Sequence, residues 1–564
     1  MSTAPKPLDL VETGLAHHFA GRHDKAEAAY KRAIGKNPKD ASALHLLGLL
    51  TADKGKFERA SQLIEKALAV DPKNPNFLHS AGHVLAQLGR LEEAVDRYRA
   101  ALEAEPDRPL TLSNLGNALK HLGHMDDAAH CLARAVEIDI GFAEGWSNLG
   151  LVEKARGAYP EAKTAFERAM TLRPENPNFR FNLANAEREA GDLDAAIAGY
   201  KAVIAQNPTH GGAHMNLAAA HKVAGDFESA NASLQFSIKA LPPDHPQLAE
   251  LHWNLAINEL TQGHWQRGWE EFEWRRKMPD YGGPEPELPI WGGDLLAGRR
   301  IILNHEQGLG DAFQFLRYAG DLAAQDGYVI YRGPKSMGPV AELITGIRET
   351  IAFEDPLPDA DCWAPMMSLP RLLKLEADAK FARERSLSPD TSLLEPYRER
   401  LEALSGLKIG MWWQGNPEYR ADRERTIPLQ AFQALAEIPG VQLVALQKGP
   451  GAEQAAEWPR DVPLLDLGPE IDAAGGAFME SAAVIDALDL VVGCDTALAH
   501  LAGALGKETH LALAKTPDWR WGLEGDNSVW YPTMTLHRQT RAGDWQGVFE
   551  RIKALIEERS AGHG

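Results

Sequence analysis

One 34-residue stretch decides the fold of the first half of the chain: residues 75–108 read PNFLHSAGHVLAQLGRLEEAVDRYRAALEAEPDR. A unit of this length recurs seven times between residues 7 and 244. Its register is marked by Pro38, Pro72, Pro106, Pro174, Pro208 and Pro242, and Ile140 takes the place of proline once. A fixed period of this length predicts stacked helical hairpins, an extended surface in place of one compact core.

Small residues explain the period physically. Gly82 and Ala94 lie twelve residues apart, and the other units repeat this pair with glycine or alanine at the first position and alanine at the second. Small residues on successive helices let their axes approach closely, and a large residue such as Tyr98 fills the space beside them. Proline then ends each hairpin. The pattern resembles the tetratricopeptide repeat, which implies an α-solenoid over residues 7–280 that binds protein partners.

A row of asparagines is a second regularity of the repeats. It consists of Asn114, Asn148, Asn182, Asn216 and, after a short insertion, Asn254. A ladder of amides offers donors and acceptors at regular intervals, which suits the backbone of an extended acceptor peptide. The row resembles the asparagine ladder of O-linked N-acetylglucosamine transferases. The alternative is that these are the ordinary asparagines of tetratricopeptide repeats, without a ligand.

Composition narrows the class of protein. The chain has 564 residues, 44% of them hydrophobic and 24% charged, as is usual for a soluble globular protein. A formal charge of −20 argues against nucleic acid as a partner, because phosphates are neutralised by lysine and arginine. We expect no membrane span and no secretory signal. The three cysteines lie far apart, which favours a reducing cytoplasm and argues against a cysteine metal cluster.

The second half alternates short strands, glycine turns and helices. Strands are predicted near residues 299–304, 328–331, 350–353, 362–364, 408–413, 442–446, 489–492 and 509–513. This alternation predicts two Rossmann-like α/β units with parallel sheets, at residues 291–385 and 405–560. Ligands of such sheets bind at the carboxyl ends of the strands, so we expect a cleft between the two units. The last helix, residues 545–558, is expected to cross back and brace the first unit.

The first predicted strand leads into Glu306-Gln-Gly308-Leu-Gly310-Asp311. The simplest interpretation is a tight strand-to-helix turn in which Asp311 caps the helix. The functional alternative is that Gly308 and Gly310 let a ligand approach the backbone, while Asp311 accepts a proton from an acceptor hydroxyl.

A second group of candidate residues follows the strand at 489–492. Asp495 and Thr496 begin a helix, and His500 lies one turn further on. A helix N-terminus of this kind favours a phosphate or diphosphate, although a helical histidine is often only packed. The loop arginines at positions 420, 423 and 425 are either solvated charges or donors to an anionic leaving group.

These motifs together resemble the GT-B glycosyltransferases, especially the heptosyltransferase-like domains that bacteria fuse to tetratricopeptide repeats. The resemblance lies in Gly308-Leu-Gly-Asp311, Trp413-Gln-Gly-Asn-Pro with Arg425, Asp495-Thr-Ala-Leu-Ala-His500 and Pro517-Asp-Trp-Arg-Trp521. It implies that Asp311 is the catalytic base. It also implies that Gly308, Gly310, Gln414, Arg425, Asp495, Thr496 and His500 bind the donor.

The sequence therefore predicts a cytoplasmic, metal-independent enzyme without a cofactor, which uses a nucleotide sugar as co-substrate. It would transfer the sugar to serine or threonine of a protein bound by the repeats, and the resemblance makes flagellin a plausible acceptor. Two alternatives remain open. One is a protein-binding scaffold whose glycosyltransferase domain has decayed, and the other is a transferase that acts on a lipid or polysaccharide.

Overall fold

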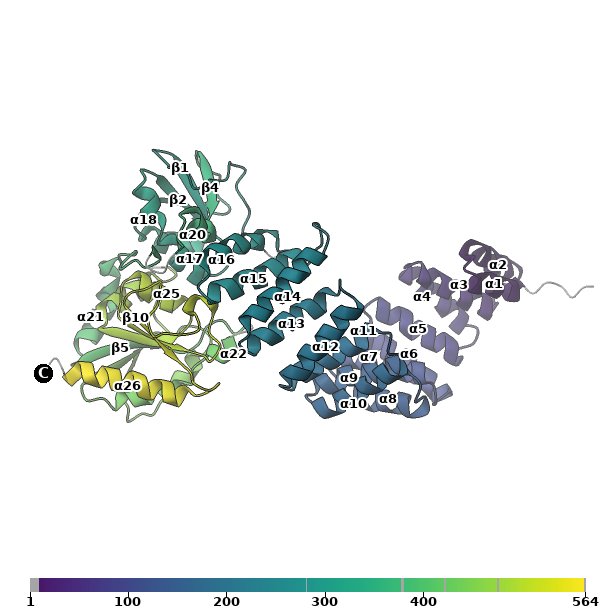
Figure 1. Cartoon of the computed structure of the whole chain (residues 1–564). Helices are drawn as coiled ribbons and strands as arrows, with labels where there is room; N and C mark the ends of the chain where they lie inside the picture. The colour runs from purple at the N-terminus through teal and green to yellow at the C-terminus, as the bar shows by residue number, and fades with distance from the viewer. Residues whose placement is uncertain (1–9, 280, 377–379, 420–421, 474–475, 562–564) are drawn as a thin grey trace, which may run out of the picture. The chain divides into compact units, whose positions relative to one another are not determined.

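The computed structural model describes residues 10–279, 281–376, 380–419, 422–473 and 476–561. The chain divides into two compact units, Met1–Ser233 and Leu234–Gly564. The first unit is entirely helical where it is described, and the second unit combines helices with two parallel sheets (Figure 1). The predicted class, an α-solenoid followed by a Rossmann-like α/β region, is confirmed.

Helices of the first unit pack in consecutive pairs. They are α1 (Leu10–Phe19), α2 (His23–Lys36), α3 (Ala41–Asp53), α4 (Phe57–Leu68), α5 (Pro75–Gln87), α6 (Leu91–Ala104), α7 (Pro109–His121), α8 (Met125–Ile138), α9 (Ala143–Ala155), α10 (Tyr159–Leu172), α11 (Pro177–Glu189), α12 (Leu193–Gln206), α13 (Gly211–Val223) and α14 (Phe227–Ala240), whose end belongs to the second unit.

Close contact within each pair explains the small residues of the repeat. A Cβ atom on Gly82 would lie 2.7 Å from Cε1 of Tyr98, the large residue of the partner helix. Gly116 meets Leu132 at the same distance, 2.7 Å from its Cγ. The recurring glycine is therefore required by the approach of two helices, as the period predicts.

The second unit begins with α15 (Leu248–Thr261), α16 (Trp265–Phe272) and the 3₁₀ turn η1 (Glu273–Lys277). These helices continue the repeat pattern, yet their apolar side chains belong to the core of the α/β region. Trp269 packs edge-on against Phe315 and Trp519, and Trp265 does so against Phe381. The last helical pair is thus an integral part of the second unit.

The first sheet has four parallel strands in the order β3-β2-β1-β4. Its strands are β1 (Arg300–Asn304), β2 (Tyr328–Gly333), β3 (Ile347–Ala352) and β4 (Cys362–Pro365). Its helices are α17 (Leu309–Leu316), α18 (Ala319–Ala323), α19 (Gly338–Glu342) and α20 (Leu369–Leu372). The chain reverses its direction of travel across the sheet between β1 and β4, so this is the position where a ligand is expected.

The second sheet has six parallel strands in the order β10-β9-β8-β5-β6-β7. Its strands are β5 (Leu407–Trp412), β6 (Val441–Ala445), β7 (Leu464–Asp466), β8 (Leu490–Cys494), β9 (Thr509–Leu513) and β10 (Met534–Arg538). If the strands are renumbered in chain order from β5 and read from β7 to β10, this is the 3-2-1-4-5-6 order of dinucleotide-binding Rossmann domains. In such domains the ligand binds where the strand order reverses, which in this sheet is between β5 and β8.

The helices of this sheet are α21 (Glu395–Glu402), α22 (Asp422–Arg425), α23 (Gln433–Ala436), α24 (Met479–Ala487), α25 (Ala497–Ala504) and α26 (Trp545–Ala561). The last helix does not brace the first sheet as expected. It packs on β9, β10 and α23 of the second sheet, where Phe549 meets Phe432 and Lys553 pairs with Glu437 (Figure 1). The apolar side chains of α26 pack on the second sheet, so the helix covers that sheet and not the first.

Candidate functional site

The loop after β1 carries the first group of predicted site residues. Gly308 begins α17, and its N–H donates to Oδ2 of Asp311 over 2.9 Å. The capping role that the sequence suggested for this carboxylate is therefore present. A Cβ atom on Gly310 would lie 3.0 Å from Cδ2 of His500 and 3.5 Å from Cα of Ala497. The first turns of α17 and α25, the helices that follow β1 and β8, are thus in direct contact.

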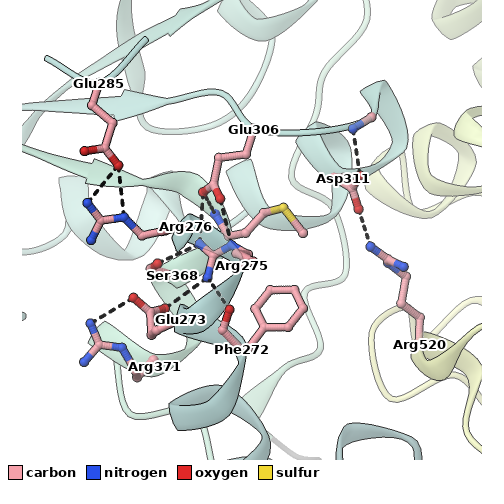
Figure 2. A network of polar contacts seen from close by, with 12 residues as sticks. Phe272, Glu273, Arg275, Arg276, Glu285, Glu306, Asp311, Ser368, Arg371 and Arg520 are labelled. Atoms are coloured by element: carbon pink, nitrogen blue, oxygen red, sulfur yellow. Dashed lines mark hydrogen bonds and ion pairs between the residues drawn. The ribbon is translucent and has the colours of Figure 1, made fainter. Parts of the chain in front are cut away.

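Arg520 connects the two sheets at this point. Its Nη2 pairs with Oδ1 of Asp311, 209 residues earlier in the chain. Nη1 donates to Asp518 over 2.7 Å, and Nε donates to Gln314 over 2.5 Å. Figure 2 shows the guanidinium reaching from the C-terminal part of the chain toward Asp311. Burial lowers the pKa of Arg520, but Asp518 and Asp311 outweigh it and raise that pKa overall.

A second buried arginine fixes the loop after β1 from the other side (Figure 2). Arg275 in η1 donates to Glu306 through Nε over 2.7 Å and Nη2 over 3.1 Å. Nη2 also donates to Oγ of Ser368, and the same Glu306 accepts the N–H of Met367 over 3.0 Å. Each side chain of this pair is 1% exposed. Arg275 therefore ties together the loops that follow β1 and β4, the two strands at the expected ligand position.

The N-terminus of α25 lies at the end of β8. Thr496 occupies the N-cap position, but its side chain accepts no hydrogen bond from the helix. Its Oγ1 is buried and, among the residues that the structure describes, has no hydrogen-bond partner. A helix N-terminus without a side-chain cap has free N–H groups that favour an anion.

His500 faces the same position from the first turn of α25. Its Nδ1 lies 2.9 Å from the hydroxyl of Tyr531, and its ring stacks on Trp521. Burial lowers the pKa of His500 well below its usual value, and the Arg520 and Arg317 guanidiniums act in the same direction. The ring is therefore neutral at pH 7. Its Nδ1 is occupied by Tyr531, and its Nε2 lies 4.0 Å from Oδ1 of Asp495.

The carboxylate of Asp495 is in an unusual environment. Burial raises the pKa of Asp495 to about 6, and the neighbouring Asp518 carboxylate acts in the same direction against Trp521 and Arg425. Arg425 pairs through Nε with Asp422 over 2.9 Å and lies 4.8 Å from the ring centre of Tyr419. The charged side chains around the α25 N-terminus are thus the arginines Arg317, Arg425 and Arg520 and the carboxylates Asp311, Asp422, Asp495 and Asp518.

Other predicted donor residues lie at different places. Gln414 exchanges backbone hydrogen bonds with the side chain of Gln447 and lies against Gly451, in the loop after β6. Arg423 is exposed, as a solvated loop charge would be. The arginine at position 420 lies outside the described residues. Of the loop arginines that are described, only Arg425 borders the candidate site.

Two Asp-x-Asp pairs bear on the prediction of a metal-independent site, because this spacing binds a divalent cation in some glycosyltransferases. Asp359 and Asp361 both bind Arg300, the first residue of β1, and therefore lie at the amino ends of the strands, opposite the site. Asp192 caps α12 through the N–H of Ala195. Neither pair lies at the carboxyl ends of the strands. Over the described ranges, no group of three or more histidine, cysteine, aspartate or glutamate side chains is placed to bind a metal ion.

The predicted asparagine row is half-buried on the first helices of its repeats. The Asn148 amide donates to Ser113 over 3.0 Å, and Asn182 and Asn216 donate likewise to Ser147 and Asn185 of the preceding repeat. Asn254 donates within its own helix, to the carbonyl of Glu250. Part of the hydrogen-bonding capacity of this row therefore links neighbouring helices, and peptide binding by Asn114 and the other members stays a prediction.

A groove of about 820 Å³ is lined by the first three repeats, which lack the asparagine row, and by the start of the fourth. His45, Phe77, His79, Arg108 and Leu110 are among its lining residues. The two histidines bind hydroxyl groups of the next repeat, Ser80 and Thr111, at 2.9 Å. Burial lowers the pKa of both to about 4, so they are neutral at pH 7.

Family models described as "Tetratricopeptide repeat" match residues 11–75, 111–139, 147–211 and 187–255, and one described as "TPR repeat" matches residues 82–123. The helical half is a tetratricopeptide-repeat solenoid. No described helix is long and apolar enough to cross a membrane.

Protein FlbA of Caulobacter vibrioides is 27% identical over 343 residues, which cover 57% of each chain. This chain thus spans little more than half the length of that relative. Because 57% of 564 residues exceeds the stretch that ends with η1, part of the match lies in the α/β region.

Solved structures of repeat proteins also resemble the chain. YrrB, "a TPR protein with an unusual peptide-binding site", is 25% identical with a TM-score of 0.30 and covers 33% of this chain and 95% of its own. A tetratricopeptide repeat protein from Parabacteroides merdae is 20% identical with a TM-score of 0.36, covering 44% of this chain and 97% of its own.

Sequence reasoning did not assign roles to Arg520, Asp518, Tyr531 and Arg275. Arg520 and Asp518 lie in the motif Pro517–Trp521. Two charged residues next to two tryptophans in so short a stretch could have indicated a buried functional role. Arg275 lies in a run of two arginines and a lysine that reads as a solvated surface. Its burial becomes apparent only when the loop after β1 is in place.

Proposed function

We propose that the chain is a GT-B protein O-glycosyltransferase that takes its sugar from a nucleotide-sugar donor. The observation that carries the proposal is the direct contact between the loop with Gly310 and Asp311 and the α25 N-terminus with Thr496 and His500. A carboxylate and an anion-binding helix end then face the same reacting atoms, one from each sheet. The repeats supply the surface that binds the acceptor protein.

In the proposed reaction a serine or threonine hydroxyl oxygen bonds to the anomeric carbon. The bond from that carbon to the donor phosphate breaks, and its electron pair leaves with the phosphate. The hydroxyl proton passes to Asp311. Arg425, His500 and the free N–H groups of α25 stabilise the departing charge without reorganisation.

A second function is favoured by one observation. Both carboxylate oxygens of Asp311 are engaged, Oδ2 by the N–H of Gly308 and Oδ1 by Arg520. A carboxylate held by a helix N–H and a guanidinium has a structural role, as expected of a decayed domain in a protein-binding scaffold.

The decisive experiment is intact-mass analysis of candidate acceptors, flagellin first, co-expressed with the full chain. We expect a sugar mass on the acceptor with the wild type and at least a hundredfold less with Asp311→Ala or Arg425→Ala, within the range of general-base and charge-stabilising effects. Exposed Arg423→Ala is the matched control and should transfer normally. Unchanged transfer by folded Asp311→Ala would exclude the mechanism. No transfer to any acceptor, together with no thermal shift with UDP, GDP, ADP or CMP, would favour the scaffold.

A further inference from the structure

Among the described residues, Arg520 is the cation that pairs with the carboxylate of Asp311, the candidate base. Its side chain is 12% exposed and that of Asp311 is 14% exposed, so their charges are only weakly screened. The backbone carbonyl of Arg520 accepts the indole N–H of Trp530 over 2.6 Å, and its guanidinium lies 4.6 Å from the ring of Trp519. The arginine is therefore held in place by packed aromatic residues, while its charged end faces the first sheet.

The same guanidinium acts on the anion-binding side of the site. It stabilises the ionised form of Asp495, which precedes Thr496, and disfavours a charge on His500. Asp311 and a phosphate at the α25 N-terminus would thus lie within the field of one arginine. Forked N–H groups are suited to both carboxylate and phosphate oxygens.

The ion pair and the proposed reaction compete for the same carboxylate. Oδ1 of Asp311 is bound to Arg520 and Oδ2 to Gly308, so each oxygen keeps a second lone pair but has a donor beside it. While the pair is closed, the guanidinium occupies the side of Oδ1 that an acceptor hydroxyl would approach. A phosphate carries more negative charge than a carboxylate and accepts the same forked N–H groups, so it is a group that can draw the guanidinium away.

We propose that Arg520 is a donor-phosphate ligand for which Asp311 competes, so that donor binding draws the guanidinium to the phosphate and frees Asp311 as the base. The inference rests on the proposed function and adds an order of events to it. Asp311 stays paired until the donor is bound, which prevents it from acting on an acceptor or water alone. Gln314 and Asp518 keep the guanidinium within reach of both partners.

The test is calorimetric titration of the full chain at low ionic strength with inorganic pyrophosphate and with UDP, GDP, ADP and CMP. Competition predicts opposite effects of the two partners. Asp311→Asn should bind pyrophosphate about tenfold more tightly than wild type, and Arg520→Gln about tenfold more weakly, as close charge pairs in partly buried sites are coupled. Arg520→Lys keeps the charge without the fork and should lie between wild type and Arg520→Gln.

The double variant Asp311→Asn/Arg520→Gln separates competition from a general loss of negative charge. Under competition it binds like Arg520→Gln alone, because no arginine remains to be released. A tightening that persists in the double variant overturns the inference. Asp321→Asn removes a carboxylate paired with Arg383 on the same sheet and should leave affinity within twofold.

The outcomes distinguish the inference from the function on which it rests. If wild type binds and transfers sugar but Asp311→Asn binds no more tightly, only the competition is wrong. If neither wild type nor Asp311→Asn binds any of the five probes, the inference is overturned. If transfer to an acceptor is then also absent, the proposed function fails with it.

Discussion

Replacing Arg275 by methionine tests how strongly the loop after β1 depends on its buried ion pair. The change leaves the carboxylate of Glu306, which is 1% exposed, with the N–H of Met367 but without its arginine, and it also removes the hydrogen bond to Ser368. Removing one partner of a buried pair costs about 3–5 kcal/mol, because the other charge stays buried. That is a large part of a typical domain stability of about 5–15 kcal/mol.

Urea unfolding followed by tryptophan fluorescence is the appropriate assay. All but one of the 14 tryptophans follow Leu234, so the signal reports mainly on the second unit. The double variant Arg275→Met/Glu306→Leu removes both charges and should regain most of the loss.

Arg276→Met is the matched control, since Arg276 is 25% exposed and pairs with Glu285, which is 41% exposed. It should cost less than about 1 kcal/mol. An Arg275→Met loss no larger than that of this control would refute the reasoning. So would a double variant no more stable than Arg275→Met.

Three further predictions concern single positions. Burial raises the pKa of Asp495 to about 6, so the protonated carboxyl stabilises the fold near pH 4 and this contribution is lost as pH rises through 6. The free energy of unfolding of Asp495→Asn, measured in urea, should therefore rise relative to that of wild type between pH 4 and 7. Gly503→Ala places a Cβ atom 2.2 Å from Cδ1 of Tyr531 and should cost about 1–3 kcal/mol in thermal unfolding, whereas Gly35→Ala, with open space around it, should be neutral or stabilising. Asn148→Ala loses the hydrogen bond to Ser113 and should lower the free energy of unfolding of the first unit by about 1 kcal/mol, measured by circular dichroism. An unchanged stability would show that this hydrogen bond does not stabilise the repeats.

Periodic and local signals in the sequence predicted most of the fold. The 34-residue repeat fixed the helical half, and continuous apolar runs predicted the central strands such as β1, β5 and β8. Two edge strands were missed. β7 has only three residues, all half-buried, and β10 mixes polar with apolar residues, so neither has a run that indicates a strand.

The site was predictable only where its chemistry is local. Asp311 follows two glycines, and Asp495 and Thr496 begin a helix, so each motif is recognisable within a few residues. The ion pair between Asp311 and Arg520 spans 209 residues, and no spacing in the sequence indicates it. Long-range partners are set by how the two sheets pack, which depends on the whole core.

The burial of α15 and α16 in the second unit has a practical consequence for dissecting the protein. A fragment that starts at Trp291, where the composition changes, would lack Trp265, Trp269, Phe272 and Arg275. The apolar surface that the three aromatic side chains cover in the α/β core would then be exposed to solvent. Such a fragment should aggregate, whereas one that starts before Leu248 keeps these groups covered. Exchange of the helical repeats between related proteins would likewise succeed only when the crossover lies upstream of this helical pair.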